Sequence, residues 1–394
     1  MSARLFWLCV GSILYTYAGY PLLVTLLARL RSRPREYPRA TPAVTLLIAA
    51  YNEEAAMAAK LDNSLTLDYP RDRLQILVAD DGSVDRTAEI VRAYAGHCVE
   101  LCHHFPRRGK MAAINQAMRQ ARGEIVILSD AHNFYAPNVV RELVAPFVDP
   151  SVGAVAGAHL VIEGDGALGA SEGLYWRYES FIKEQETRLG CCTAVTGDIL
   201  AIRRDQFERP PEGIINDDFY IPMRLIRRGY RVIYTPRARS WEHVAPTARD
   251  EMARRARIVA GRYQAITLAH RLLPLHRPLI VWQVVSHKFL RPLVPLAMAG
   301  ALLANLVAVV RPVRRRHRRL VHLAPPVNWI ILALQMIFYG LAWLGTRVER
   351  RGFAGTLLYV PTYLVNSNLA AVMGLFRFLT RQQTPLWERV QRWR

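Results

Sequence analysis

The distribution of apolar residues divides the chain into a central region of short apolar runs and two flanking regions of long ones. Residues 5–30 contain one charged side chain, Arg29, and about 20 apolar residues suffice to cross a bilayer. Toward the other end, apolar runs occupy residues 293–310, 327–344 and 353–376. The pattern predicts three to four membrane spans flanking a soluble domain.

In the central region, short apolar runs that end in polar side chains alternate with helical stretches. We expect strands over residues 43–49, 74–79, 98–102 and 125–128, and helices over residues 55–67, 85–94 and 111–120. Strands that alternate with helices are typical of a mostly parallel, doubly wound α/β sheet. In such sheets, ligands bind outside the carboxyl ends of the strands, where the polar side chains of this chain are concentrated.

The second half of the central region mixes strands and helices. We expect an amphipathic helix over residues 174–189, a helix that begins near Asn216 and ends at Gly229, a strand over residues 230–234 and a basic helix over residues 250–270. Residues 276–291 are amphipathic and precede Pro292. This pattern favours a helix that lies at the membrane interface.

The composition adds a strong positive charge to this picture. The formal net charge is +20 while 52% of the residues are hydrophobic, which a membrane protein with basic flanks explains and a nucleic-acid-binding protein does not. The sparse cysteines are expected to be reduced thiols. A cleaved signal peptide would carry its basic residues before the apolar run, whereas here the arginines follow it. The positive-inside rule therefore places the central domain on the cytoplasmic side of a protein that is expected to cross the membrane several times.

The topology of the C-terminal spans conflicts with the same rule. If residues 293–310 cross the membrane, the arginine-rich loop at residues 311–319 lies outside. Either this run is re-entrant, or helix packing overrides the charge rule.

Three carboxylates at the ends of neighbouring predicted strands carry the first chemical signal. Asp80, Asp81 and Asp130 would repel one another if all were ionised in a partly dry cleft, so a positive group or a shared proton is required. A divalent cation with a diphosphate ligand, assisted by Arg108 and Lys110, would neutralise them. The alternative is that each acid serves only as a helix cap or turn former.

Taken together, the polar motifs resemble those of the family 2 glycosyltransferases, which have the GT-A fold. The resemblance covers residues 44–264, and the membrane flanks are similar to the branch that includes cellulose, hyaluronan and chitin-oligosaccharide synthases. The motifs that carry it are, in order, Tyr51-Asn52-Glu53, Asp80-Asp81-Gly82-Ser83, Gly109-Lys110, Asp130-Ala131-His132 and Asn216-Asp217-Asp218.

The resemblance implies roles for these residues. The turn from Tyr51 to Glu53, together with the Asp80-Asp81 turn, would hold the base and ribose of a nucleotide-sugar. Lys110 would lie near the nucleotide, and Asp130 would contact the ribose or a metal ion. Asp218, beside Asp217, would be the general base that takes the proton of the acceptor hydroxyl. The start of a helix favours the ionised form of Asp218, while the like charge of Asp217 opposes it.

Two departures from the family pattern concern the metal and the acceptor. His132 stands where the family has the second metal-binding acid, so His132 or Asn133 would ligate Mn2+ or Mg2+, or metal dependence is weakened. His243 is a further candidate ligand, although both histidines could instead be structural. Arg257 matches the arginine of the family's Gln-x-x-Arg-Trp motif and can clamp a phosphate, but Ile258 replaces the tryptophan, which argues against long processive synthesis.

A last motif falls where relatives line the acceptor site. The Thr196-Gly197-Asp198 turn is therefore expected to bind the acceptor, although such turns are common.

The expected function is inverting transfer of a sugar from a nucleotide-sugar, with a UDP-sugar favoured, to a saccharide acceptor at the membrane. The alternatives are a single transfer to a polyprenyl phosphate or lipid, and a silent scaffold subunit of a polysaccharide-export complex. Expected partners are membrane lipids and polysaccharide-export proteins, and no nucleic acid. The expected division is a transmembrane helix (1–30), a linker (31–42), the GT-A domain (43–270), an interfacial helix (271–292), a membrane region (293–380) and a basic tail (381–394).

Overall fold

The protein is described by a computed structural model that covers residues 1–31, 37–162, 167–243, 248–313, 318–347, 353–382 and 386, without the side chains of 161–174, 243, 248–249 and 353–357. It divides into two compact units, each described by itself. The sheet unit comprises Val24–Glu251, Gln264–Val284 and Arg381–Arg394, and the helical unit comprises Met1–Leu23, Met252–Tyr263 and Val285–Thr380.

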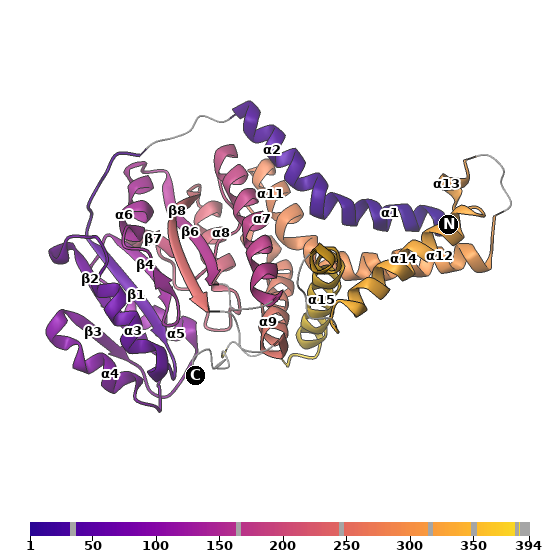
Figure 1. The fold of residues 1–394 in the computed structure, drawn as a ribbon. Coiled ribbons are helices and arrows are strands. Elements are labelled where there is room, and N and C mark those ends of the chain that lie inside the picture. Colours follow the sequence, from indigo (N-terminus) through magenta and orange to yellow (C-terminus); the bar gives the residue numbers. More distant parts are fainter. Residues whose placement is uncertain are drawn as a thin grey trace. The chain divides into compact units, whose positions relative to one another are not determined.

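The sheet unit is built on one mixed sheet, which in the described residues has eight strands in the order β3-β2-β1-β4-β7-β6-β8-β5 (Figure 1). Neighbours pair in parallel from β3 to β4 and between β6 and β8, and antiparallel around β7 and at β5. The strands are β1 (Val44–Ala50), β2 (Leu74–Asp80), β3 (Val99–His103), β4 (Ile125–Asp130), β5 (Phe134–Tyr135), β6 (Val152–Ile162), β7 (Leu200–Arg203) and β8 (Arg231–His243). The predicted mostly parallel α/β sheet is confirmed.

The strand register brings the acids of two strands to the same edge of the sheet. β1 lies between β2 and β4, with Ala50 opposite Asp80 and Ala49 opposite Asp130. The chain runs from β1 to β2 and β3 on one side and then crosses from β3 to β4 on the other side of β1, so a topological switch point lies between β1 and β4. The polar residues after β4 therefore occupy the crevice where ligands of such sheets bind.

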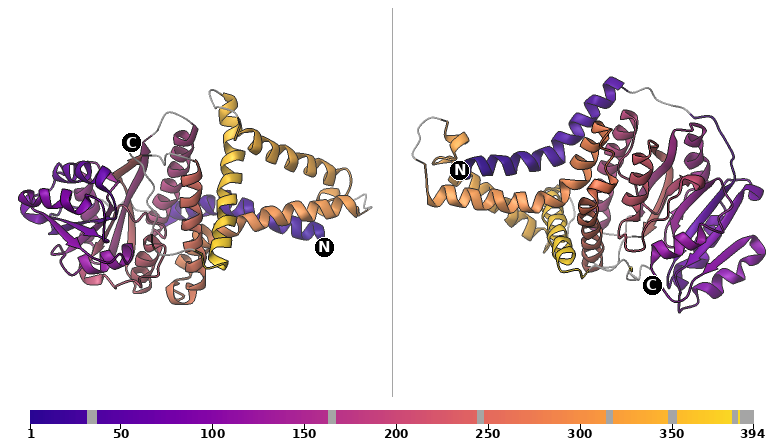
Figure 2. Two further views of the ribbon diagram at one scale, coloured as in Figure 1. Left: turned by 90° about the horizontal axis from the view of Figure 1, so that it is seen from below. Right: turned by 180° about the vertical axis from the view of Figure 1, so that it is seen from behind.

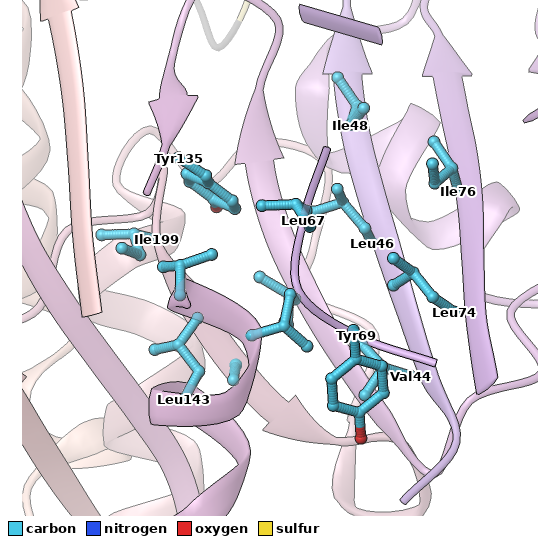
Figure 3. Close-up of a cluster of buried hydrophobic side chains, with 14 of the residues drawn as sticks. Val44, Leu46, Ile48, Leu67, Tyr69, Leu74, Ile76, Tyr135, Leu143 and Ile199 are labelled. Atoms are coloured by element: carbon cyan, nitrogen blue, oxygen red, sulfur yellow. The ribbon is translucent and has the colours of Figure 1, made fainter. Parts of the chain in front are cut away.

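The apolar runs became buried strands because helices cover both faces of this part of the sheet. Alternate residues of β1, Val44, Leu46 and Ile48, point to the face that Figure 3 shows, together with Leu74 and Ile76 of β2. The same cluster includes apolar residues of α3, α4 and α6. α5 packs on β1 and β2, and α7 and α8 pack on β6 and β8. All seven residues of β1 are buried, as expected for a central parallel strand.

The helices of the sheet unit follow the predicted order. Gly229, with φ at +99°, ends α8 as the C-terminal cap that the sequence predicts. β8 is longer than the predicted strand over residues 230–234, because it pairs with β6 as far as His243. The helices are α3 (Glu54–Leu65), α4 (Thr87–Ala93), α5 (Lys110–Ala117), α6 (Val139–Val144), α7 (Ala167–Leu189), α8 (Asp217–Arg227), α10 (Ala269–Leu272) and α11 (Pro278–Val284).

The helical unit contains long apolar helices, and α1 and α12 run side by side in it (Figures 1 and 2). Its helices are α1 (Ser2–Leu14), α12 (Val294–Val310), α13 (Arg319–His322), α14 (Val327–Leu344) and α15 (Phe353–Leu379), while α2 (Tyr20–Arg31) and α9 (Ala248–Thr267) belong to both units. A π-helical segment, Tyr15–Gly19, joins α1 to α2, and another, Val285–Phe289, follows α11. Within the described residues, three helices are long and apolar enough to cross a membrane: Ser2–Arg31, Pro278–Val310 and Val327–Leu344.

The expected interfacial helix over residues 271–292 overlaps a longer helical stretch, and its position at a membrane interface stays a prediction. Residues 278–310 form one 33-residue helical stretch, which passes through a short 3-10 turn, Arg291–Leu293, at Pro292. A proline in the first turn of a helix loses no hydrogen bond, so Pro292 leaves the chain helical on both sides.

Candidate active site

The acids that follow β2 are buried and hold the neighbouring loops. Asp80 accepts a hydrogen bond from His103 Nδ1 at 2.6 Å and from the backbone N–H of Ser83 at 3.2 Å. Asp81 accepts the backbone N–H groups of Arg108 and Gly109, each at 2.9 Å. Both carboxylates are fully buried, so they act by holding the loops that follow β2 and precede α5.

The loop ahead of α5 carries the basic groups. Gly109 has φ at +103°, a conformation that L side chains rarely adopt, and it begins α5 so that Lys110 faces the strand ends. The guanidinium of Arg107 lies 3.6 Å from the centroid of the Tyr51 ring, and its Nε lies 3.6 Å from Asp81 Oδ2. Arg107 therefore contacts both Tyr51 and Asp81, two predicted nucleotide-binding residues.

Lys110 connects the two groups of acids that the sequence places far apart. Its Nζ lies 2.7 Å from Asp130 Oδ1 and 3.4 Å from Asp217 Oδ2. Burial by itself would raise the pKa of the Asp130 carboxyl, but the charges of Lys110 and His132 outweigh it and hold that pKa below its ordinary value. Lys110 thus meets part of the demand for a positive group among these carboxylates.

His132 lies between two carboxylates. Its Nδ1 is 3.4 Å from Glu53 Oε1, and its Nε2 is 3.4 Å from Glu242 Oε2. The side chain is partly exposed, as is that of Asp130. The predicted substrate-binding residue Glu53 and the predicted metal ligand His132 therefore belong to one cluster.

Asn133 turns away from this cluster into the interior. It is fully buried, and its side-chain amide donates to Asp198 Oδ2. The structure thus brings Asn133 to the predicted acceptor turn and not to Asp130 and His132.

The turn from Thr196 to Asp198 lies against the start of α8. A Cβ on Gly197 would lie 3.2 Å from the Cβ of Asp218 and 3.4 Å from Asp217 Oδ2. The Thr196 hydroxyl and Asp217 Oδ2 are both buried without a hydrogen-bond partner in the described part of the chain. The predicted acceptor turn therefore lies directly beside the predicted catalytic acids.

Three polar residues of this site were not predicted: Lys60, His159 and Glu242. Lys60 is fully buried on α3 and donates to Ser129 Oγ at 2.8 Å and to the backbone carbonyl of Asn133. Its position in the apolar repeat of α3, between Met57 and Leu61, is the signal that could have revealed it. His159 and Glu242 are set into paired strands, β6 and β8, whose pairing the sequence does not display.

The functional roles of all these site residues stay predictions, and for two of the residues the described part of the structure shows no contact with the others. The side chain of His243 lies outside the described residues. Arg257 lies on α9, in the helical unit.

The fit of a divalent cation can be judged from these positions. Asp130 offers an oxygen ligand at the switch point, but Lys110 is its present partner, and carboxylates face both ring nitrogens of His132. Among the described residues, no group of three or more His, Cys, Asp or Glu side chains is arranged to hold a metal ion. The described residues thus supply part of a ligand set, chiefly the Asp130 oxygens and the His132 ring.

Comparison with known proteins agrees with the fold and the motifs. The family model described as Glycosyl transferase family 2 matches residues 45–209. The chain is 25% identical over 363 residues to the probable glycosyltransferase YdaM of Bacillus subtilis (strain 168), covering 87% of this chain and 84% of that protein. It is 27% identical over 229 residues to the poly-beta-1,6-N-acetyl-D-glucosamine synthase of Staphylococcus aureus (strain COL), covering 57% of this chain and 55%, about half, of that relative.

A solved structure shows the same fold. The mannosyltransferase PcManGT from Pyrobaculum calidifontis, in complex with GDP-Man and Mn2+, aligns with a TM-score of 0.68 at 24% identity. The alignment covers 93% of this chain and 99% of that one.

Proposed function

Residues 45–209 form a family 2 glycosyltransferase domain of the GT-A fold, and from this premise we propose that the chain transfers a sugar from a nucleotide-sugar to an acceptor at the membrane with inversion. The observation that carries the proposal is the position of Lys110, whose ammonium lies between Asp130 at the end of β4 and Asp217 at the start of α8. The Lys110 ammonium therefore connects Asp130, on the proposed donor side, with the acids at the start of α8 that are proposed to act on the acceptor.

The proposed reaction is a single displacement. A carboxylate at the start of α8, Asp218, takes the proton of the acceptor hydroxyl, and the hydroxyl oxygen attacks the anomeric carbon of the donor sugar. The bond from that carbon to the diphosphate breaks, and the nucleoside diphosphate leaves. The positive charge of Lys110 beside Asp130 stabilises the leaving diphosphate, as preorganised charges do in phosphate chemistry.

A divalent cation would add to this stabilisation. Asp130 and His132 would hold it together with the diphosphate, and it would neutralise charge on the leaving group. Mn2+ accepts an imidazole ligand, whereas Mg2+ prefers oxygen, so His132 favours Mn2+. The GT-A neighbour that was solved with GDP-Man and Mn2+ supports a cation here. Asn133 is not part of the proposal because its amide is committed to Asp198.

The relatives support a narrower choice of donor and acceptor. One relative is a poly-beta-1,6-N-acetyl-D-glucosamine synthase, which supports a saccharide acceptor, and a UDP-sugar is our proposed donor. We place the sheet unit in the cytoplasm of a bacterial inner membrane, because Arg29 and Arg31 end the first apolar helix. The second candidate function is a single transfer to a polyprenyl phosphate. It is favoured because Ile258 follows Arg257 where the family motif has a stacking tryptophan.

The base assignment is tested with Asp218→Asn and Asp217→Asn in protein reconstituted in liposomes. Radiolabelled UDP-glucose, UDP-N-acetylglucosamine and GDP-mannose are supplied one at a time with Mg2+ or Mn2+, and farnesyl phosphate or a chitotriose is the acceptor. Because a general base contributes about 10²- to 10⁴-fold, Asp218→Asn should lower transfer by at least about 100-fold while nucleotide affinity stays within about twofold.

Asp217→Asn serves as the neighbouring control, since it removes the same charge one residue away. It should weaken nucleotide binding through Lys110 and retain more transfer than Asp218→Asn. Turnover retained in Asp218→Asn would contradict the base assignment, and a ladder of long products would exclude single transfer.

A further inference from the structure

A buried histidine lies between the two halves of the proposed site. His159, on β6, is 4% exposed, and its Nδ1 donates to Asp198 Oδ2 at 2.6 Å. Its Nε2 lies 3.4 Å from Glu242 Oε1 on β8. Burial opposes a charge on this ring, but the carboxylates of Asp198 and Glu242 outweigh it and raise the pKa of His159 to about 10. The ring is therefore a fixed internal cation at neutral pH.

On its Nδ1 side, His159 anchors the turn that faces the acceptor. Asp198 is held at both its side chain and its backbone: its carboxylate accepts from His159 and Asn133, and its carbonyl accepts from the Tyr135 hydroxyl at 2.7 Å. Tyr135 is fixed in turn in the apolar cluster of Figure 3. Of these three donors only His159 carries a charge, so it contributes most to holding the carboxylate in place.

The Thr196-Gly197-Asp198 turn itself packs against the proposed catalytic acids at the start of α8. Gly197 lies so close to the start of α8 that a Cβ there would be 3.2 Å from the Cβ of Asp218. A shift of Asp198 away from His159 would therefore change the contact between the turn and Asp218.

On its Nε2 side, His159 shares Glu242 with the donor half of the site. The other oxygen of Glu242 lies 3.4 Å from His132 Nε2, and His132 Nδ1 faces Glu53. The Trp176 ring, 4.5 Å from the His159 ring between centroids, packs against the imidazole. The ring thus has a carboxylate at each nitrogen and an aromatic ring against it, which leaves it little freedom to turn.

We propose that His159 is a positioning residue that holds the Thr196-Gly197-Asp198 turn against Asp218, so that the sugar is passed to the acceptor hydroxyl and not to water. The inference rests on the proposed function and deepens it. Loss of His159 would loosen the acceptor side of the site, while Asp81, which the backbone N–H groups of Arg108 and Gly109 hold, would keep its position.

The experiment compares His159→Leu and His159→Gln with the wild type in liposomes. The probes are the radiolabelled nucleotide-sugar that the wild type uses and the better of its two acceptors, farnesyl phosphate or chitotriose. Both sugar transferred and free sugar released by hydrolysis are measured, with nucleoside diphosphate affinity determined by calorimetry. Because a misplacement of about 1 Å can cost about 100-fold in rate, His159→Leu should lower transfer by about that factor. The hydrolysed share of turnover should rise about tenfold, with nucleotide affinity within about twofold of the wild type. His159→Gln keeps a hydrogen-bond donor for Asp198. Its transfer rate and its hydrolysed share should therefore lie between those of His159→Leu and those of the wild type.

A matched control separates positioning from a general loss of stability. Thr45→Val removes a buried hydroxyl that bonds to Gln75 and Gly123 at the far end of β1, without changing side-chain shape. It should lower the melting temperature without raising the hydrolysed share.

An unchanged share of hydrolysis in His159→Leu, or loss of transfer in proportion to stability as in Thr45→Val, would overturn the inference about His159. The proposed function would still stand. A folded wild type that binds and turns over no nucleotide-sugar would overturn the proposed function and the inference together.

Discussion

At the scale of single residues, Lys60 is a charged group of the site whose burial lowers the stability of the fold. A buried ammonium is unfavourable, and here burial lowers the pKa of Lys60 to about 7 although Asp130 and Asp198 act in the opposite direction. The ammonium lies 4.1 Å from the centroid of the Tyr135 ring and donates to Ser129 and to the Asn133 backbone. Lys60 therefore joins α3 to the chain that follows β4, at a cost in stability.

This cost depends on pH. Between the folded pKa of about 7 and the ordinary value of 10.5, the unfolded chain binds more protons at Lys60 than the folded chain does. The free energy of unfolding should therefore rise with pH across this window, by at most about 1.4 kcal/mol per pH unit. Lys60→Met should lack this contribution. Melting curves of both proteins in detergent at several values between pH 7.5 and 9.5 test it, and parallel profiles would show that Lys60 does not titrate there.

At the scale of elements, the close approach of β4 to β1 sets the position of Asp130. Gly123 precedes β4, and a Cβ there would lie 2.3 Å from the backbone N of Thr45 and 2.5 Å from the backbone C of Val44. Backbone atoms cannot move aside as the end of a side chain can. Only glycine therefore allows β4 to begin in this register.

Gly123→Ala should accordingly destabilise the sheet unit by about 1–3 kcal/mol, as overpacking of a well-packed site does. Gly96→Ala is the matched control, because a Cβ at Gly96 meets no atom within 4 Å. Melting temperatures of the two variants measure the difference. Equal stability of both would show that β4 can shift without cost.

At the scale of the whole molecule, the exposed apolar side chains of the helical unit indicate a membrane protein. Leu334, near the middle of α14, is 59% exposed, and large apolar residues such as Ile330 and Ile337 on the same helix are exposed as well. Water would not favour such a surface, whereas lipid would.

Leu334→Arg should reduce membrane insertion of α14, because arginine at the centre of a spanning helix costs about 2.5–3.5 kcal/mol. Val84→Arg places the same charge on an exposed apolar residue of the sheet unit and should have no effect. Because the other apolar helices would also hold the protein in the membrane, insertion is measured at α14 itself, as the fraction of a topology reporter placed directly after α14 that crosses the membrane. A reporter that crosses as well in Leu334→Arg as in the wild type would mean that this face of α14 does not contact lipid.

The sequence by itself determined the α/β class, the first four strands and the long apolar helices, because apolar periodicity and turn residues act over short distances along the chain. It also placed Asp80, Asp81 and Asp130 at strand ends, since a strand that runs into acids is visible locally. The rule that parallel strands end at one edge predicted that these acids share one edge of the sheet, which the register of β1 with β2 and β4 confirms.

Only the tertiary structure decided which basic groups lie beside which acids of the site. Lys110 reaches from α5 to both Asp130 and Asp217, and His159 meets Asp198 and Glu242 through the pairing of β6 and β8. Both clusters join residues from separate elements, and strand pairing between distant segments is not encoded in local pattern. The antiparallel pairing of β4 with β7 likewise gave Asn133 the partner Asp198 and not a place beside His132. Burial then decides the charge of these groups, because the cost of desolvation and the nearby charges that offset it exist only once the chain is folded.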